Sequence, residues 1–168
     1  MALAIINGSI FDSKELFIVH QCNIVSTKPT FLAKAIFELY PYANIYVTRA
    51  TNKYKDVPGA ISVSGNGYDK RFIINLFGQL YPGIPLYPNS GKDSFEMRLQ
   101  YFKSGLSLIS QLPLVQDSSN KLSDNFIAGI AFPFGIGCSS AGGNWNIYLQ
   151  ALKNFSEKIN IPVVIYKL

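Results

Sequence analysis

Residues 126–152 read FIAGIAFPFGIGCSSAGGNWNIYLQAL, and this stretch contains three local patterns in succession. The short apolar run at 126–132 predicts a buried strand. A glycine-rich segment follows at 133–143, and Trp145, Leu149 and Leu152 then recur at helical spacing. A strand, a glycine-rich loop and a helix in this order are typical of α/β proteins, whose ligands bind beyond the carboxyl ends of the strands.

The same alternation extends along the rest of the chain. Apolar, β-branched or aromatic runs bounded by turn residues predict further strands at 3–6, 16–20, 60–63, 72–77 and 161–166. Helical spacing predicts a helix at 95–109, with Asp93 and Glu96 as its capping box, and a shorter one at 32–39 that Pro41 ends. Several strands are apolar at successive positions, as in sheets covered on both faces. We therefore predict a three-layer α/β/α sandwich with a central mixed, largely parallel sheet.

Length and composition limit the class of protein. The chain has 168 residues, which predicts a single domain spanning 1–168. With 48% hydrophobic and 15% charged residues, it is too apolar for disorder. No apolar run approaches the roughly 18–20 residues of a membrane span, and no secretory signal opens the sequence. We expect a monomer without membrane contact, located inside the cell in the cytoplasm or nucleus.

Few residues of this chain could hold a metal or form disulfides. It has two cysteines, Cys22 and Cys138, and one histidine, His20, without ligand spacing. We therefore predict no metal site and no cofactor. The net charge of +5 is scattered rather than gathered in a run, which suits an anionic ligand better than a nucleic acid.

Two segments do not fit any regular element. Residues 81–92 carry three prolines and two glycines, which predicts a long loop, and long ordered loops often have a function. Residues 116–124 are polar and predict a solvated surface loop.

The glycine-rich segment is the first candidate site. Glycines let the backbone approach a ligand closely, and amide groups near a helix N-terminus attract anions. This favours a phosphate-binding loop, although the spacing matches neither a Walker loop nor the dinucleotide fingerprint. The alternative is a glycine-rich turn that binds no ligand.

The second candidate is the tetrapeptide His20-Gln21-Cys22-Asn23 at the end of a predicted strand. The amide of Asn23 can both donate to and accept from a sugar hydroxyl. Because side chains alternate along a strand, His20 and Cys22 share one face and could form a nucleophile pair. The alternative is that both are core residues. Asn23 and His20 are the catalytic candidates.

Five motifs in order along the chain resemble one family: NGSIF at 7–11, IVHQCN at 18–23, LAKAIFELYP at 32–41, INLFGQ at 74–79 and PFGIGCSSAGGNW at 133–145. The chain resembles the macrodomains, which are ADP-ribose-binding α/β/α sandwiches. It is most similar to the branch that includes ADP-ribose 1''-phosphate phosphatases and mono-ADP-ribosyl hydrolases. The glycine-rich motif is the most specific of the five.

This resemblance implies a ligand site at matching positions. Ser9 and Ile10 would lie by the adenine, Asn23 would face the distal ribose, and the loop at 26–32 would close over the diphosphate. The complete set of implied contacts is Ser9, Ile10, Gln21, Asn23, Thr30, Phe31, Leu32, Gln79, Phe134, Gly135, Ile136, Gly137, Cys138, Ser139, Ser140 and Ala141.

Three departures from the family pattern affect this expectation. Ser9 stands where most macrodomains have an aspartate for the adenine amino group, which predicts relaxed base selectivity. The first loop, 26–31, has no glycine, so that Phe31 could act as a gate or as a stacking platform. Ala141 or Asn144 replaces the acidic residue of the hydrolases, which removes a general base. Asn144 could equally be a helix N-cap.

Two functions follow from the resemblance. The first is binding of ADP-ribose or a related phosphorylated ribose, with hydrolysis of ADP-ribose 1''-phosphate or of protein-linked mono-ADP-ribose. The second is a non-catalytic ADP-ribose reader, which the missing glycines and acid favour, or a partner-binding module that uses the loop at 81–92.

Overall fold

The computed structural model describes residues 3–49, 51, 55–117, 119 and 123–168. In this part of the chain a six-stranded sheet has the order β1-β6-β5-β2-β4-β3. Its strands are β1 (Leu3–Asn7), β2 (Glu15–Cys22), β3 (Ile61–Ser64), β4 (Phe72–Phe77), β5 (Ile127–Pro133) and β6 (Val163–Lys167). All six predicted strands are confirmed.

The sheet is mixed and largely parallel, as predicted. Strand β2 pairs in parallel with both β4 and β5, and β6 pairs in parallel with β5 and β1. The edge strand β3 runs antiparallel to β4. Because β2, β4 and β5 are parallel neighbours, the segments that follow their carboxyl ends meet at one edge of the sheet.

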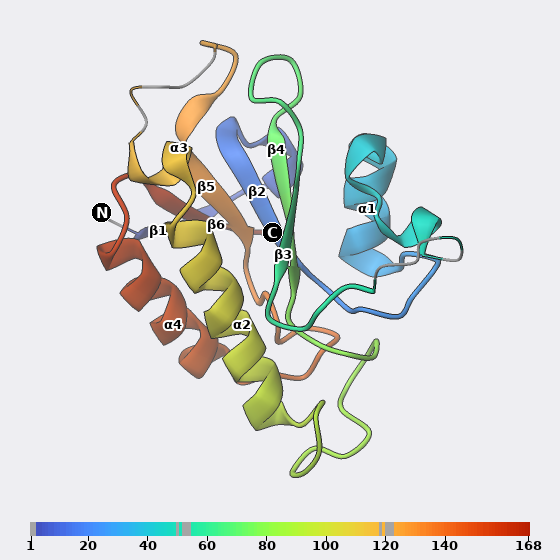
Figure 1. The fold of residues 1–168 in the computed structure, drawn as a ribbon. Helices are drawn as coiled ribbons and strands as arrows, with labels where there is room; N and C mark the ends of the chain where they lie inside the picture. Colours follow the sequence, from blue (N-terminus) through green and yellow to red (C-terminus); the bar gives the residue numbers. More distant parts are fainter. Residues whose placement is uncertain (1–2, 50, 52–54, 118, 120–122) are drawn as a thin grey trace.

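Helices cover the two faces of the sheet, which gives the predicted three layers (Figure 1). Helices α2 (Phe95–Ser110) and α4 (Trp145–Glu157) lie side by side on one face, and α1 (Phe31–Leu39) lies on the other. The short α3 (Pro113–Gln116) follows α2. Gly105 allows α2 to approach β4, since a Cβ there would lie 2.5 Å from Leu76 Cγ.

The caps of the helices differ in part from the sequence prediction. Ser94, not Asp93, is the N-cap of α2, and its hydroxyl accepts a hydrogen bond from Met97 N. Asp93 instead pairs with Arg98, so the predicted capping box is wrong. Asn144 caps α4 through a hydrogen bond from Asn146 N, which matches one of its two expected roles.

Two segments, 81–92 and 116–124, match no helix or strand pattern in the sequence. Residues 81–92 form turns and bends and contain no helix or strand. The predicted surface loop at 116–124 includes residues 118 and 120–122, which lie outside the described residues.

Candidate functional site

A cavity of about 680 Å³ opens at the edge of the sheet where β2, β4 and β5 end. Three loops line it: the segment after β2, the start of the 81–92 loop, and the glycine-rich loop after β5. These segments are far apart in the sequence, but the parallel pairing of their strands brings them together. The cavity therefore occupies the place where α/β proteins bind ligands.

Most of the residues predicted as ligand contacts line this cavity. They are Gln21, Asn23, Thr30, Phe31, Leu32, Gln79 and the run Phe134, Gly135, Ile136, Gly137, Cys138, Ser139, Ser140 and Ala141. Lys28 also lines it, and the described cavity wall contains no Asp or Glu. The wall thus carries one ammonium group and no opposing carboxylate, which favours an anionic occupant.

The structure does not bring Ser9 and Ile10 to the cavity wall. Ser9 is the N-cap of the 3-10 helix η1 (Ile10–Asp12), and its hydroxyl accepts a hydrogen bond from Phe11 N at 3.2 Å. Ile10 is buried in the core beneath α1. Their expected contact with an adenine remains a prediction that this geometry does not support directly.

His20 and Cys22 share one face of β2, as predicted, but that face packs into the core beneath α1. His20 is only 1% exposed, and its Nε2 lies 2.5 Å from Asn75 Oδ1. Burial lowers the pKa of His20 to about 4, against the raising effect of the Asn75 hydrogen bond. Burial also raises the pKa of the Cys22 thiol to about 12. The pair is therefore neutral and does not line the cavity.

The glycine-rich loop lines the cavity and leaves several backbone N–H groups without an internal acceptor. Gly135 and Gly137 have φ angles of 79° and 77°, which side chains rarely adopt. The N–H groups of Ile136, Cys138 and Ser139 donate to carbonyls within the loop. In the described part of the chain, the N–H groups of Gly135, Gly137, Ser140 and Ala141 donate to no protein acceptor. All four residues line the cavity, so these donors are left for a ligand.

Phe31 has an unusual backbone conformation at the cavity rim. Its φ angle is 51°, in the left-handed region that glycine adopts without strain, although it is the first residue of α1. Its side chain is 81% exposed, so the ring does not fill the cavity. The backbone therefore keeps a conformation typical of glycine while an aromatic ring stands at the entrance.

The comparisons with known proteins rest on structure alone, since no protein-family model and no curated protein sequence matches the chain. The macrodomain of Mycobacterium tuberculosis DarG has a TM-score of 0.72 and 18% identity, over 99% of this chain and 98% of that one. This chain has the macrodomain fold. A structure of Thermosipho africanus DarTG in complex with ADP-ribose has a TM-score of 0.65 and 17% identity, over 97% of this chain and 41% of that one. The Trypanosoma brucei macrodomain in complex with ADP-ribose has a TM-score of 0.58 and 16% identity, over 98% of this chain and 63% of that one.

Within this macrodomain fold, the side chain of Asn23 makes several internal hydrogen bonds. Its Oδ1 accepts from Val25 N at 3.0 Å, from Ser26 N at 2.8 Å and from Arg49 Nη1 at 3.2 Å. Its Nδ2 donates to Ser26 Oγ at 2.9 Å. Asn23 therefore shapes the first loop, which follows β2, and leaves one N–H of its amide for other partners.

Sequence reasoning missed two arginines that organise the cavity loops. Arg49 contacts Asn23 and Ser26, and Arg98 contacts Gly83 and Ala141, all four of which line the cavity. Arg98 stands at a polar position of a helix, and Arg49 lies outside any periodic pattern. Neither residue carries a local signal that could have marked it.

The remaining predictions concern metals and membranes. Within the described ranges, no group of three or more His, Cys, Asp or Glu side chains could hold a metal ion. No described helix of the chain is long and apolar enough to cross a bilayer.

Proposed function

We propose that residues 1–168 form a single macrodomain that binds ADP-ribose, or a closely related phosphorylated ribose, in the cavity beyond β2, β4 and β5. One observation carries this proposal: the N–H groups of four cavity-lining residues, Gly135, Gly137, Ser140 and Ala141, have no protein acceptor in the described part of the chain. Unpaired amides in a loop just ahead of a helix N-terminus are suited to a diphosphate.

The charge and size of the cavity support the same ligand class. Lys28 adds a positive charge to a described wall without carboxylates. A volume of about 680 Å³ lies within the ordinary range for small-molecule sites. Two proteins of similar fold were solved in complex with ADP-ribose, and we extend that ligand to this chain as part of the proposal.

We further propose recognition rather than turnover as the main activity. Hydrolysis of ADP-ribose 1''-phosphate or of protein-linked mono-ADP-ribose needs a group that activates water or protonates the leaving group. Among the described residues of the cavity wall there is no Asp, Glu or His, and Asn23 is engaged in holding the first loop. A reader of ADP-ribose needs only the binding groups.

Calorimetry with ADP-ribose tests the binding proposal. Ser140→Glu places a carboxylate on the exposed side of the glycine-rich loop, and like-charge repulsion should weaken binding at least about tenfold. Ser107→Glu, on the exposed surface of α2, is the matched control and should bind as the unmodified protein does. If the unmodified protein gives no saturable binding at millimolar ADP-ribose, the proposed function is wrong.

A turnover assay then separates the reader from the hydrolase. The protein is incubated with ADP-ribose 1''-phosphate and, separately, with a mono-ADP-ribosylated protein, and released phosphate or ADP-ribose is measured. We expect no release above the uncatalysed rate. Release that Ser140→Glu abolishes and Ser107→Glu leaves intact would establish the hydrolase instead.

A further inference from the structure

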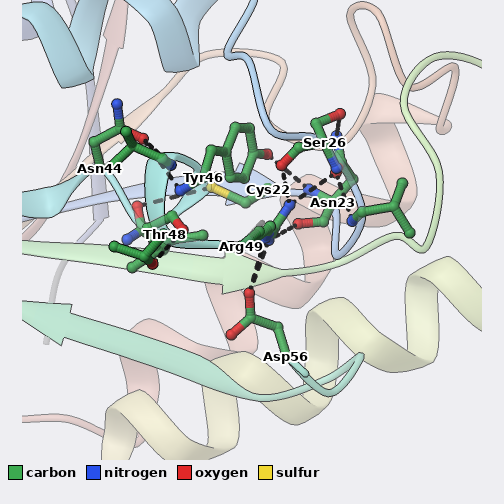
Figure 2. A network of polar contacts seen from close by, with 12 residues as sticks. Cys22, Asn23, Ser26, Asn44, Tyr46, Thr48, Arg49 and Asp56 are labelled. Atoms are coloured by element: carbon green, nitrogen blue, oxygen red, sulfur yellow. Dashed lines mark hydrogen bonds and ion pairs between the residues drawn. The ribbon is translucent and has the colours of Figure 1, made fainter. Parts of the chain in front are cut away.

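Arg49 uses all five of its N–H groups within the protein, and Figure 2 shows this network. Nε and Nη2 donate to Asp56 Oδ2 at 3.1 and 2.9 Å. Nη1 donates to Asn23 Oδ1 and Ser26 O, at 3.2 and 2.9 Å, and Nη2 also donates to Asn23 O at 2.5 Å. A guanidinium bonded in this way has one orientation, because its donors form a rigid planar fork.

The aromatic ring of Tyr46 holds the same guanidinium from one side. Arg49 Cζ lies 4.1 Å from the centroid of that ring, within the range of a cation–π contact. The Tyr46 hydroxyl accepts a hydrogen bond from Asn23 N at 3.1 Å. Arg49 does not itself line the cavity, whereas Asn23, Ser26 and Tyr46 do. Arg49 thus stands behind the cavity wall and is bonded to it.

The bonds to Asn23 determine which way its amide points. Arg49 Nη1, Val25 N and Ser26 N can only donate, so the atom that faces them must be the carbonyl oxygen. The amide nitrogen is therefore directed to Ser26 Oγ, which accepts its hydrogen bond at 2.9 Å.

The chain of hydrogen bonds ends at a hydroxyl group on the cavity wall. Because Ser26 Oγ accepts from Asn23, its own proton is left to donate elsewhere. That proton finds no acceptor among the described protein groups. A hydroxyl in this state is a ready donor to an anionic oxygen, and such charge-assisted bonds are the stronger kind.

We propose that Arg49, anchored by Asp56, is a positioning residue that orients Asn23 and thereby directs the Ser26 hydroxyl as a donor to a phosphate oxygen of the bound ligand. The proposal rests on the proposed function for the identity of the ligand. It adds Ser26 as a binding residue and Arg49 and Asp56 as the residues that prepare it.

Two arginine-to-lysine variants separate positioning from general stability. Arg49→Lys keeps the charge but cannot reach the four acceptors of the guanidinium. Arg71→Lys is the matched control, since Arg71 is buried and likewise donates to backbone carbonyls, those of Ser13 and Glu15, neither of which lines the cavity. Both variants are measured at a temperature where circular dichroism shows them folded.

Hydrogen exchange in the absence of ligand tests whether Arg49 stabilises the loop that follows β2. We expect faster exchange of the Val25 and Ser26 amides in Arg49→Lys, and unchanged exchange in Arg71→Lys, because only Arg49 shares their acceptor. Equal exchange of these two amides in both variants would overturn the positioning role, whatever the ligand proves to be.

A double-mutant cycle tests the route through Ser26. Ser26→Ala and Arg49→Lys should each weaken ADP-ribose binding about tenfold, and the double variant should lose little more than either, because both remove the same contact. Additive losses, or unchanged affinity in Arg49→Lys, would overturn this inference alone. If the unmodified protein binds no ADP-ribose, the proposed function and the ligand role of Ser26 both fail.

Discussion

Arg98 and Asp93 form a bidentate ion pair beneath the cavity, with Nη2 2.6 Å from Oδ2 and Nε 2.9 Å from Oδ1. The side chains are only 2% and 14% exposed. The same guanidinium donates to Gly83 O at 2.6 Å and to Ala141 O at 3.3 Å. The pair therefore joins the 81–92 loop to the glycine-rich loop and sets the spacing of two cavity walls.

Asp93→Asn should destabilise the protein by about 3 kcal/mol, because it leaves the buried Arg98 cation without a counter-charge. Urea unfolding followed by circular dichroism measures the change. Glu38→Gln is the control, since its partner Lys34 is 3.9 Å away and the two side chains are 67% and 63% exposed. The free energy of unfolding of Glu38→Gln should fall by less than about 1 kcal/mol. Similar losses in the two variants would contradict the structural role assigned to Arg98.

Phe31→Gly should be more stable than Phe31→Ala by about 1 kcal/mol, because only glycine adopts a φ of 51° without strain. The free energies of unfolding of the two variants give this difference directly. Both variants remove the ring, so their affinities for ADP-ribose test its role. Since the ring is 81% exposed, we expect a platform and a loss of about tenfold in both. Tighter binding in both would show that the ring is a gate.

Gly137→Ala should destabilise the protein by roughly 2 kcal/mol or more, through both its backbone and its neighbours. Its φ is 77°, and a Cβ there would lie 2.4 Å from Tyr148 Cε2. Gly91→Ala has a similar φ of 80° but meets nothing within 4 Å, so it isolates the backbone contribution. Thermal unfolding should give Gly137→Ala a clearly lower melting temperature than Gly91→Ala. Equal melting temperatures would refute the close packing of Gly137 on Tyr148.

The stability of the protein should fall below pH 6.5 because of His20, the one histidine in the sequence. Burial lowers the pKa of His20 from 6.5 to about 4 in the folded state. As the pH falls between these values, the unfolded chain takes up a proton that the folded chain does not, so the folded state loses about 3 kcal/mol by pH 4.

Urea unfolding at a series of pH values measures this effect, with His20→Asn as the reference because it keeps the carboxylates and removes the imidazole. The difference in free energy of unfolding between the unmodified protein and His20→Asn should be constant above pH 7. It should become smaller as the pH decreases below that value. Parallel profiles down to pH 4 would mean that His20 takes up its proton as readily in the folded protein as in the unfolded chain.

Much of the fold could be predicted from local patterns. All six strands and the helices α1, α2 and α4 match segments with clear apolar spacing, since burial of one face or two leaves a periodic trace in the sequence. The three cavity loops could also be located, because each follows a predicted strand. The capping box at Asp93 was wrong for a related reason: a local pattern cannot show that the carboxylate of Asp93 pairs with Arg98.

The sequence by itself thus determined the α/β/α architecture, the glycine-rich loop and most of the residues that line the cavity. Only the tertiary structure decided that His20 faces the core, that Ser9 caps a turn, and that Arg49 and Arg98 hold the cavity loops. The physical reason is the range of the interactions. Periodicity reports the burial of neighbouring residues, whereas the bond from Arg49 to Asn23 spans 26 positions and the bond from Arg98 to Ala141 spans 43. Such contacts exist only once the strands have paired.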